Sequence, residues 1–410
     1  MKLHVRTFLK KIKIALEPMG YRLASIFFSL VPRVKPDLVF ENFGVNFIGY
    51  SKGELGLGQA MRSMAFAAKQ ALIPFVVRQF QVRITSNQSN KALDAYARDQ
   101  CKYPINIICV NPDMLYRLPL WVSYSEWVKT YNIGYWFWEL ENFPDSWKYA
   151  THMVDEIWVA TEFIAEAMRK SGKKVVKIPF PLEFEMPPEF MNKEYFGLNP
   201  NEFTFIFSFD FNSVPERKNP QAIVMAFKQA FLETDYSVRL IFKAMNGSHY
   251  SKFRKNLEQL IDQDPRIEIR DEVLNQNEMR ALIRSSDCYI SLHRAEGLGL
   301  GLAEAMYMGK PTIATAYSGN LEFMNDSNSM LIGCKLTPVL RGAYPNGYGQ
   351  LWAQPNITEA AASMRTISTD ANLRLKLGHS ASSYMRINHS YLRVGNLIKS
   401  ELNRIYLDKY

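Results

Sequence analysis

The stretch SLHRAEGLGLGLAEAMYMGKPTIATAYSG, residues 291–319, combines a strand, a glycine loop and a helix with two carboxylates. The apolar run Cys288–Leu292 predicts a buried strand that ends at the loop. Leu302–Met308 predicts a short helix, closed by a glycine and a proline, and Thr312–Ala316 predicts the next strand. Strands that alternate with helices in this way indicate a parallel sheet covered by helices.

The loop in this stretch has the composition of a ligand site. Three glycines follow Glu296, and Glu304 falls in the first turn of the predicted helix. Backbone N–H groups and the positive end of the helix dipole favour an anion there, most often a phosphate. Carboxylates instead accept hydrogen bonds from sugar hydroxyls, so the pattern predicts a site for a phosphorylated sugar compound. The alternative is that Glu304 only stabilises the helix N-terminus and that Glu296 is an ordinary loop carboxylate.

The same stretch resembles the E-x7-E signature of the retaining GT-B glycosyltransferases of the family-4 type, which use nucleotide sugars. The resemblance continues through EAMYMGKPTIAT and the turn Ser318–Glu322, and it is specific across about residues 203–355. In that family the first glutamate approaches the donor sugar and the second holds the ribose hydroxyls of the nucleotide. The resemblance therefore implies that Glu296 faces the transferred sugar and Glu304 the ribose. It also implies donor contacts from the loop between them: Gly297, Leu298, Gly299 and Leu300.

The composition fits a globular protein of two domains. The chain has 410 residues, more than one ordinary core holds, and 47% of them are hydrophobic and 22% charged. Its four cysteines lack metal-ligand spacing, which favours a reducing compartment such as the cytoplasm. The resemblance implies an α/β fold of the GT-B class. In that fold two Rossmann-like, doubly wound domains face each other across a cleft, and the C-terminal helix crosses back to the first domain.

Strand-like and helix-like segments alternate along most of the chain, which we divide into four parts. Residues 1–36 are expected to form a basic amphipathic leader, and residues 37–190 a Rossmann-like domain on the acceptor side. Prolines between residues 179 and 201 interrupt the alternation and predict a linker. Residues 191–375 are expected to form the Rossmann-like domain that binds the nucleotide sugar. The helices of residues 376–410 are expected to pack back toward the N-terminal domain.

The net charge of +9 is concentrated in the leader, where eight Lys and Arg residues accompany one Glu. The apolar residues of the leader recur at helical spacing: Val5, Phe8, Leu9, Ile12 and Leu16. A basic amphipathic helix of this kind binds anionic membrane surfaces, and the alternative is that it docks on the protein's own surface. The rest of the chain is nearly balanced in charge, which disfavours a nucleic-acid binder.

A second glycine loop between a strand and a helix occurs in the first domain, GYSKGELGLGQAMR at residues 49–62. Gly53, Gly56 and Gly58 remove the side chains that would keep a diphosphate from the backbone. The resembled family has a glycine loop here, near the donor phosphates, although most glycine-rich segments are simply turns. The spacing departs from the G-x-G-x-x-G order, so we expect no dinucleotide cofactor.

Three further residues are candidates for contacts with the sugar or the acceptor. The segment GYWFWELENFPDSW, residues 134–147, concentrates aromatics at a strand end where related enzymes place a histidine near the donor sugar. This chain has Trp138 and Glu139 there, and a hydrophobic wedge in the core explains Trp138 equally well. His293 adjoins the signature loop and is the third candidate.

Arg217 and Lys218 follow the first predicted strand of the second domain. Two cations there would stabilise a diphosphate as its bond to the sugar breaks, and the alternative is an ordinary solvated pair. In the resembled family a lysine in this loop binds the distal phosphate, and Lys218 matches it. The usual arginine comes earlier, where this chain has Asp210–Asn212, so either Arg217 or Lys243 replaces it. Val273 matches the segment that holds the base through backbone groups, which leaves GDP- and UDP-linked donors both open.

The resemblance implies a retaining glycosyltransferase, and phosphate binding by amides and cations favours one that is metal-independent and needs no cofactor beside its nucleoside diphosphate sugar. Asp262–Asp264 has the letters of a metal-binding Asp-x-Asp, but it falls at a helix end, where acidic turn residues need no metal. We expect the acceptor to be a glycan or a lipid-linked hydroxyl in cell-surface polysaccharide synthesis at the inner membrane face. GDP-mannose is the donor that family frequency favours. The alternative is a non-catalytic nucleotide-sugar-binding subunit of a glycan-assembly complex.

Overall fold

The computed structural model describes residues 19–20, 22–23, 26–27, 30–31, 34, 36–80, 87–118 and 122–408. The chain forms two compact units. Unit 1 comprises residues 1–138, 142–181 and 391–410, and unit 2 comprises residues 139–141 and 182–390. The predicted apolar positions of the leader, from Val5 to Leu16, lie outside the described residues.

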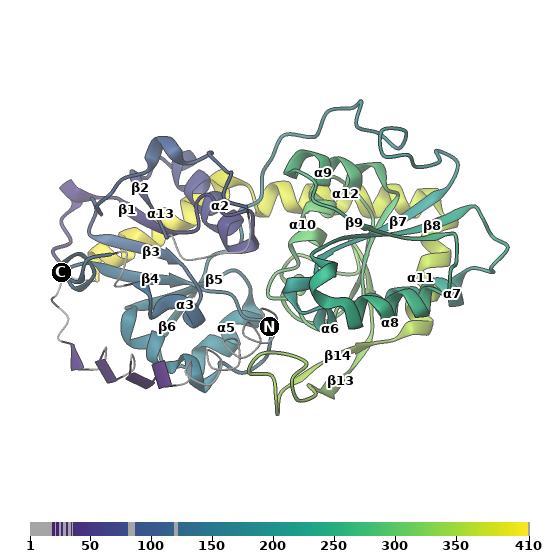
Figure 1. The fold of residues 1–410 in the computed structure, drawn as a ribbon. Coiled ribbons are helices and arrows are strands. Elements are labelled where there is room, and N and C mark those ends of the chain that lie inside the picture. The colour runs from purple at the N-terminus through teal and green to yellow at the C-terminus, as the bar shows by residue number, and fades with distance from the viewer. Residues whose placement is uncertain are drawn as a thin grey trace, which may run out of the picture. The chain divides into compact units, whose positions relative to one another are not determined.

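Unit 1 is built on a six-stranded parallel sheet with helices on both faces (Figure 1). The strands follow the order β2-β1-β3-β4-β5-β6. Their bounds are Val45–Gly49 (β1), Phe75–Gln79 (β2), Ile105–Cys109 (β3), Tyr131–Tyr135 (β4), Glu156–Val159 (β5) and Lys174–Lys177 (β6). The helices are Gly56–Gln70 (α2), Pro112–Leu115 (α3), Tyr124–Val128 (α4), Glu162–Arg169 (α5) and Tyr391–Leu407 (α13). Because β1, β3 and β4 are buried on both faces, the parallel sheet forms the core of the unit.

The last helix of the chain, α13, packs against α2 within unit 1. A Cβ at Gly395 would lie 2.1 Å from the carbonyl oxygen of Ala67, so the absence of a side chain lets the two helices approach closely. On α13, Arg404 also donates two hydrogen bonds of 2.8 Å to the buried Glu156 of β5. The predicted return of the C-terminal helix to the first domain is therefore confirmed.

Unit 2 contains a second six-stranded parallel sheet, in the order β12-β11-β10-β7-β8-β9. Its strands are Phe203–Asp210 (β7), Val238–Met245 (β8), Ile267–Asp271 (β9), Cys288–Ser291 (β10), Thr312–Thr315 (β11) and Met330–Ile332 (β12). Its helices are Pro215–Lys218 (α6), Pro220–Ala230 (α7), Ser251–Ile261 (α8), Gln276–Ser285 (α9), Leu300–Tyr307 (α10), Ile357–Thr369 (α11) and Ala371–Asn388 (α12). An antiparallel hairpin, Cys334–Pro338 (β13) and Leu351–Pro355 (β14), follows β12. Helices α9, α10 and α12 cover one face of the sheet, and α7, α8 and α11 cover the other (Figure 1).

The division between the units differs from the predicted boundaries at residues 190 and 375. The chain enters unit 2 after Pro181 because Arg284 of α9 donates hydrogen bonds to carbonyls of the proline-rich segment, including those of Pro188 and Met191. It leaves unit 2 only after Ser390 because α12 packs on α10. The final part of the chain in unit 1 is therefore α13 alone, without the C-terminal part of α12.

Candidate functional site

The candidate site lies at the carboxyl ends of β7, β10 and β11 in unit 2. The turn after β7 carries α6, the turn after β10 carries Glu296 and the glycines, and the turn after β11 carries Ser318. Parallel α/β sheets bind their ligands at this edge, because the loops that follow adjacent strands converge there. The edge is also the one at which the first residues of α10 present their N–H groups.

A buried ion cluster occupies this edge. The carboxylate of Glu296 lies 2.9 Å from Nη1 of Arg217 through Oε2, and 2.6 Å from Nζ of Lys218 through Oε1. Glu296 is 7% exposed and Arg217 is 4% exposed. The three residues predicted as catalytic are therefore brought together, and the structure does not support the alternative of a solvated basic pair.

The two cations fix the protonation state of the carboxylate. Burial alone would raise the pKa of Glu296, but the charges of Arg217 and then Lys218 outweigh it and hold the pKa well below its usual range. Burial lowers the pKa of Lys218, and the charge of Glu296 opposes that effect. Glu296 is thus a carboxylate at neutral pH, which accepts hydrogen bonds and has no proton to give as a general acid.

The backbone around α6 presents both cations to Glu296. Val214 precedes this short helix with φ of 62°, and Asn219 follows it with φ of 54°, a left-handed conformation that is unusual for a β-branched residue such as valine. Arg217 is held by its own donors, which reach the carbonyl of Ala295 at 2.7 Å and that of Ser213 at 3.2 Å. Strained backbone of this kind persists where its surroundings fix it, and it is frequent at functional sites.

The glycines of residues 291–319 are required by a left-handed backbone at one position and by close contacts at two others. Gly299 has φ of +88° at the N-cap of α10. A Cβ at Gly301 would lie 2.2 Å from the hydroxyl of Tyr289, and one at Gly319 would lie 2.0 Å from the carbonyl oxygen of Gly297. The loops after β10 and β11 are also joined by a bond of 2.8 Å from the amide of Gly319 to the carbonyl of Glu296. Only glycine fits these positions without displacing the loop that carries Glu296.

The two leucines predicted to contact the donor occupy different environments. Leu298 is buried at 7% exposure, and Leu300 is the first residue of α10. Leu298 therefore contributes packing, and any donor contact it makes comes from its backbone. Leu300 supplies one of the N-terminal amides of the helix, the group that an anion would approach.

Glu304 lies deeper in α10 than the sequence suggested. The sequence predicted that Glu304 lies in the first turn of the helix. The helix begins at Leu300, so Glu304 lies beyond the first turn, and a role limited to stabilising the helix N-terminus is not supported. Its Oε1 accepts hydrogen bonds from Arg280 of α9 at 3.1 and 3.0 Å. The guanidinium of Arg280 also stacks on Phe184, 3.8 Å from the ring centroid. Sequence reasoning missed Arg280, because no local motif marks a partner 24 residues away.

Two of the predicted sugar contacts are core residues instead. His293 is fully buried, with one ring nitrogen 3.0 Å from the hydroxyl of Ser291 and the other 3.1 Å from the side-chain oxygen of Asn320. Trp138 is 2% exposed and donates a bond of 2.9 Å to the carbonyl of Asn142. Both residues hold neighbouring segments in place, so the structure does not support their predicted contacts with the sugar or the acceptor.

The remaining candidate near the family histidine, Glu139, does approach the ion cluster. Its Oε1 lies 3.9 Å from Nη2 of Arg217, and its Oε2 accepts a hydrogen bond from the hydroxyl of Tyr344. Lys243, in contrast, donates to the backbone carbonyls of Ala244 and Glu272. Arg217, not Lys243, therefore joins Lys218 beside Glu296.

The last predicted donor contacts are Val273 and the glycine loop of unit 1. Val273 follows β9 and is 80% exposed. A Cβ at Gly58 would lie 2.2 Å from the carbonyl oxygen of Gly53, and Arg62 donates a bond of 2.8 Å to that same carbonyl. Gly56 has open space around it. The loop is a packed turn held by Arg62, and its contact with the donor phosphates stays a prediction.

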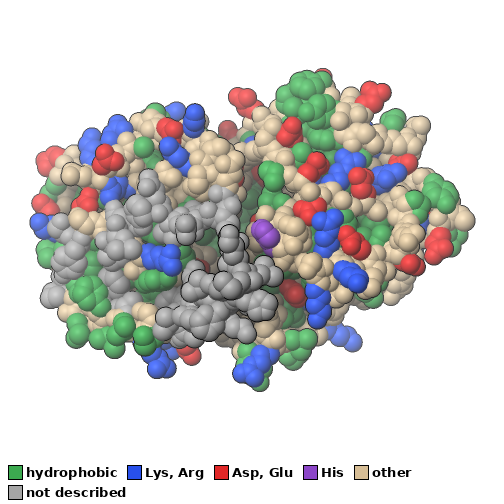
Figure 2. Space-filling view, in the orientation of Figure 1, with side chains coloured by type: hydrophobic (Ala, Val, Ile, Leu, Met, Phe, Trp, Pro, Cys, Tyr) green, Lys and Arg blue, Asp and Glu red, His purple; other side chains and the backbone are tan. Residues whose placement is uncertain are grey.

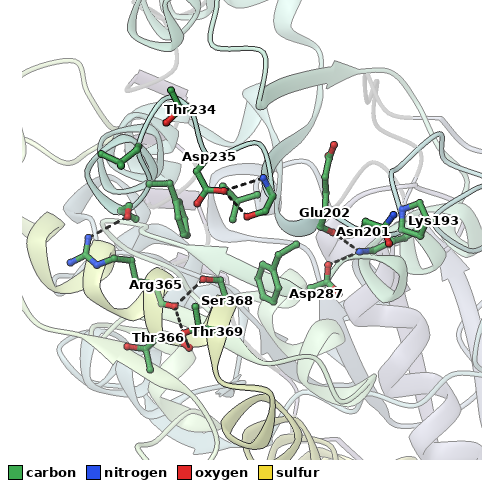
Figure 3. A pocket seen from close by; sticks show the side chains of 17 residues that line it. Lys193, Asn201, Glu202, Thr234, Asp235, Asp287, Arg365, Thr366, Ser368 and Thr369 are labelled. Atoms are coloured by element: carbon green, nitrogen blue, oxygen red, sulfur yellow. Dashed lines mark hydrogen bonds and ion pairs between the residues drawn. The ribbon is translucent and has the colours of Figure 1, made fainter.

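Two other features of unit 2 lie away from the candidate site. A cavity of about 990 Å³ lies at the opposite, amino edge of the sheet, where Glu202 and Asp287 line it (Figure 3). In the predicted Asp-x-Asp, Asp262 adopts a left-handed backbone at the end of α8 and Asp264 pairs with Arg266 at 2.7 Å, as expected of a structural turn. In the described part of the chain, no group of three or more His, Cys, Asp or Glu side chains is arranged so that it could hold a metal ion.

Part of the sequence matches a known family, and most of the chain resembles solved structures. Residues 203–337 match the sequence model of the family described as Glycosyl transferases group 1, and no curated protein matches the chain in sequence. Among solved structures, Anabaena HepE in complex with UDP and glucose is 14% identical, with a TM-score of 0.62, and the alignment covers 88% of this chain and 100% of HepE.

Two further structures align over nearly the whole chain. Sucrose-phosphate synthase from Thermosynechococcus elongatus is 12% identical with a TM-score of 0.64, and the alignment covers 89% of this chain and 100% of the synthase. A glycosyltransferase from Rickettsia africae is 16% identical with a TM-score of 0.62, and the alignment covers 90% of this chain and 100% of that one. At these identities the likeness shows the fold, and the chain therefore has the GT-B fold, built from two Rossmann-like α/β units.

Proposed function

We propose that the protein is a retaining glycosyltransferase that moves a sugar from a nucleoside diphosphate sugar to a hydroxyl of a glycan or lipid-linked acceptor. The observation that carries this proposal is the buried cluster in which Glu296 lies between Arg217 and Lys218. The cluster stands in the part of the chain that matches the glycosyltransferase family, at the edge where parallel sheets bind ligands. HepE, which shares the fold, has been solved with UDP and with UDP-glucose, which supports a nucleotide-sugar donor.

The proposed mechanism uses the residues of this cluster and needs no metal or cofactor. Lys218 and Arg217 would neutralise the diphosphate as the bond between the anomeric carbon and the phosphate oxygen breaks. Glu296, held as a carboxylate, would accept hydrogen bonds from hydroxyls of the sugar. The acceptor oxygen forms the new bond on the same face of the sugar, and its proton passes to the departing phosphate oxygen. Glu304 would accept hydrogen bonds from the ribose hydroxyls.

A thermal-shift screen followed by a product assay tests the proposal. The screen uses UDP- and GDP-linked sugars, GDP-mannose among them. Donors with the base that fits the site should raise the melting temperature, because a ligand that binds only the folded state stabilises it. The same donor, supplied with glycan and lipid-linked acceptors, should then yield a glycosylated product of retained anomeric configuration. A clear rise in melting temperature, without product from any combination of donor and acceptor, would favour the non-catalytic nucleotide-sugar-binding subunit instead.

The substitution Glu304→Gln is expected to weaken nucleotide binding. It removes the charge that we assign to the ribose hydroxyls, and the loss of one charge-assisted hydrogen bond should raise the Kd of the free nucleoside diphosphate by roughly tenfold. Calorimetric titration measures the effect. Glu194→Gln, at an exposed position of unit 2, removes the same charge and should leave Kd unchanged. An unchanged Kd in Glu304→Gln would argue that Glu304 serves only its pair with Arg280.

We also propose that the protein is cytoplasmic and associates with the inner membrane face through residues 1–36. Six described apolar side chains of this segment recur at helical spacing and are 52% to 75% exposed: Met19, Leu23, Ile26, Phe27, Leu30 and Val34. Figure 2 shows hydrophobic side chains where Figure 1 places these segments. None of the helices among the described residues is long and apolar enough to cross a membrane. An exposed apolar stripe beside basic residues suits adsorption to an anionic bilayer.

Co-sedimentation with lipid vesicles tests the membrane proposal. The full chain should bind vesicles that contain phosphatidylglycerol and should bind neutral phosphatidylcholine vesicles much more weakly. The double variant Leu23→Glu and Phe27→Glu should lower binding to the anionic vesicles by about tenfold or more, because it places two charges on the apolar stripe. Leu72→Glu, at another exposed apolar position of unit 1, serves as the control. Equal binding by the double variant would contradict the proposal.

A further inference from the structure

The hairpin β13–β14 is fastened to the turn that carries Arg217. The amide of Ala353 on β14 donates a bond of 2.8 Å to the carbonyl of Arg294, and the amide of Arg294 donates a bond of 2.8 Å to the carbonyl of Arg217. The guanidinium of Arg294 lies 5.1 Å from the ring centroid of Trp352 and donates to the side chain of Gln354, both on β14. The hairpin therefore has a defined position relative to the ion cluster.

The loop of this hairpin brings Tyr344 to Glu139. The phenol hydroxyl donates a hydrogen bond to Oε2 of Glu139, and the other oxygen of that carboxylate is 3.9 Å from Nη2 of Arg217. Glu296 lies much closer to the same guanidinium, at 2.9 Å. Burial, together with the charge of Glu139, raises the pKa of Tyr344 well above its usual value. The hydroxyl consequently stays protonated and remains a donor at any physiological pH.

The hydrogen bond from Tyr344 restrains a carboxylate that competes for Arg217. A carboxylate at 3.9 Å attracts the guanidinium less than one in direct hydrogen-bond contact, because Coulomb energy falls with distance and charge-assisted hydrogen bonds require about 2.7–2.9 Å. Without the phenol hydroxyl, Glu139 would be able to close on Arg217. The guanidinium would then be shared between two carboxylates and would offer less positive charge to a diphosphate.

We infer that Tyr344 is a positioning residue for sugar transfer, which acts through Glu139 to keep the charge of Arg217 available to the leaving diphosphate. This role rests on the proposed function. Tyr344 lies outside the glycine loops and outside the turn that carries α6. Tyr344 contributes no proton to the reaction, and its effect should be confined to the step in which charge develops on the diphosphate.

The variant Tyr344→Phe, which keeps the ring and removes only the hydroxyl, tests the inference. We expect kcat to fall by roughly tenfold while the donor KM changes less than about twofold, because stabilisation of the leaving group is lost and uniform binding is kept. Tyr348→Phe is the matched control, since Tyr348 belongs to the same loop and is 76% exposed. It should leave both constants unchanged.

A double-mutant cycle separates action through Glu139 from a general loss of packing. Glu139→Gln removes the competing charge, so the added Tyr344→Phe change should have almost no further effect on kcat in that background. Additive losses in the cycle, or a normal kcat in Tyr344→Phe, would overturn the inference while transfer by the wild-type protein still supported the proposed function. Absence of transfer by the wild-type protein with every donor and acceptor would instead count against the proposed function itself.

Discussion

The variant Glu296→Gln is expected to lower kcat by about 10²–10³-fold, the size of effect seen when one preorganised polar contact to a transition state is lost. The carboxylate is fully ionised at neutral pH because Arg217 and Lys218 hold its pKa low. It can therefore accept strong hydrogen bonds from sugar hydroxyls, whereas the amide of glutamine accepts weaker ones. The nucleotide is assigned to other residues, so the Kd of the free nucleoside diphosphate should change by less than about threefold.

Stability must be measured in the same variant, because Glu296 also neutralises two buried cations. Removing one member of a buried ion pair costs roughly 3–5 kcal/mol, so a lower melting temperature is expected. The neutral amide keeps an oxygen acceptor for one cation, which makes glutamine a milder change than alanine. Glu194→Gln controls for net charge. Turnover close to that of the wild type, in a variant shown to be folded by its nucleotide titration, would contradict the role given to Glu296.

The fold was predictable from the sequence because its strands and helices carry strong local signals. The strand β10 has only buried residues and ends at a glycine loop, and the following helix occurs within two residues of its predicted start. Lys218 and Glu296 were predicted as parts of one site because both match site residues of the resembled family. In the structure they follow neighbouring strands of a parallel sheet, β7 and β10. The carboxyl ends of such strands share one edge, so strand order alone brings these residues close together.

The partners that complete the site were not predictable, because they are distant in sequence and carry no motif. Arg280 reaches Glu304 from another helix, and Tyr344 reaches Glu139 across 205 residues. Whether a given side chain is exposed or buried also cannot be predicted from its neighbours in the sequence. His293 stands next to the signature loop and is nevertheless fully buried among polar partners. A polar residue near a motif can equally be a ligand contact or a structural bridge, and only packing distinguishes the two.

The variant Lys218→Met should show the second large effect, a fall in kcat of about 100-fold or more. Methionine preserves the length of the side chain but removes the ammonium group that we assign to the leaving diphosphate. The Kd of the nucleoside diphosphate should also rise, because a phosphate contact serves the bound donor as well as the transition state. Lys255→Met, at an exposed position of α8, removes the same charge and should leave kcat and Kd unchanged.

The pH dependence of kcat distinguishes loss of the contact between Lys218 and Glu296 from misfolding of the variant. In the wild-type protein the pKa of Glu296 is well below its usual range, so its protonation should not limit activity between about pH 5 and 8. Loss of Lys218 removes one of the two cations that hold that pKa down, so the pKa of Glu296 should rise and an acid limb should move toward neutral pH. Arg217 still holds the carboxylate, which keeps this shift smaller than the loss of both cations would produce. An unchanged kcat with an unshifted acid limb would mean that Arg217 alone supplies the charge that the diphosphate needs.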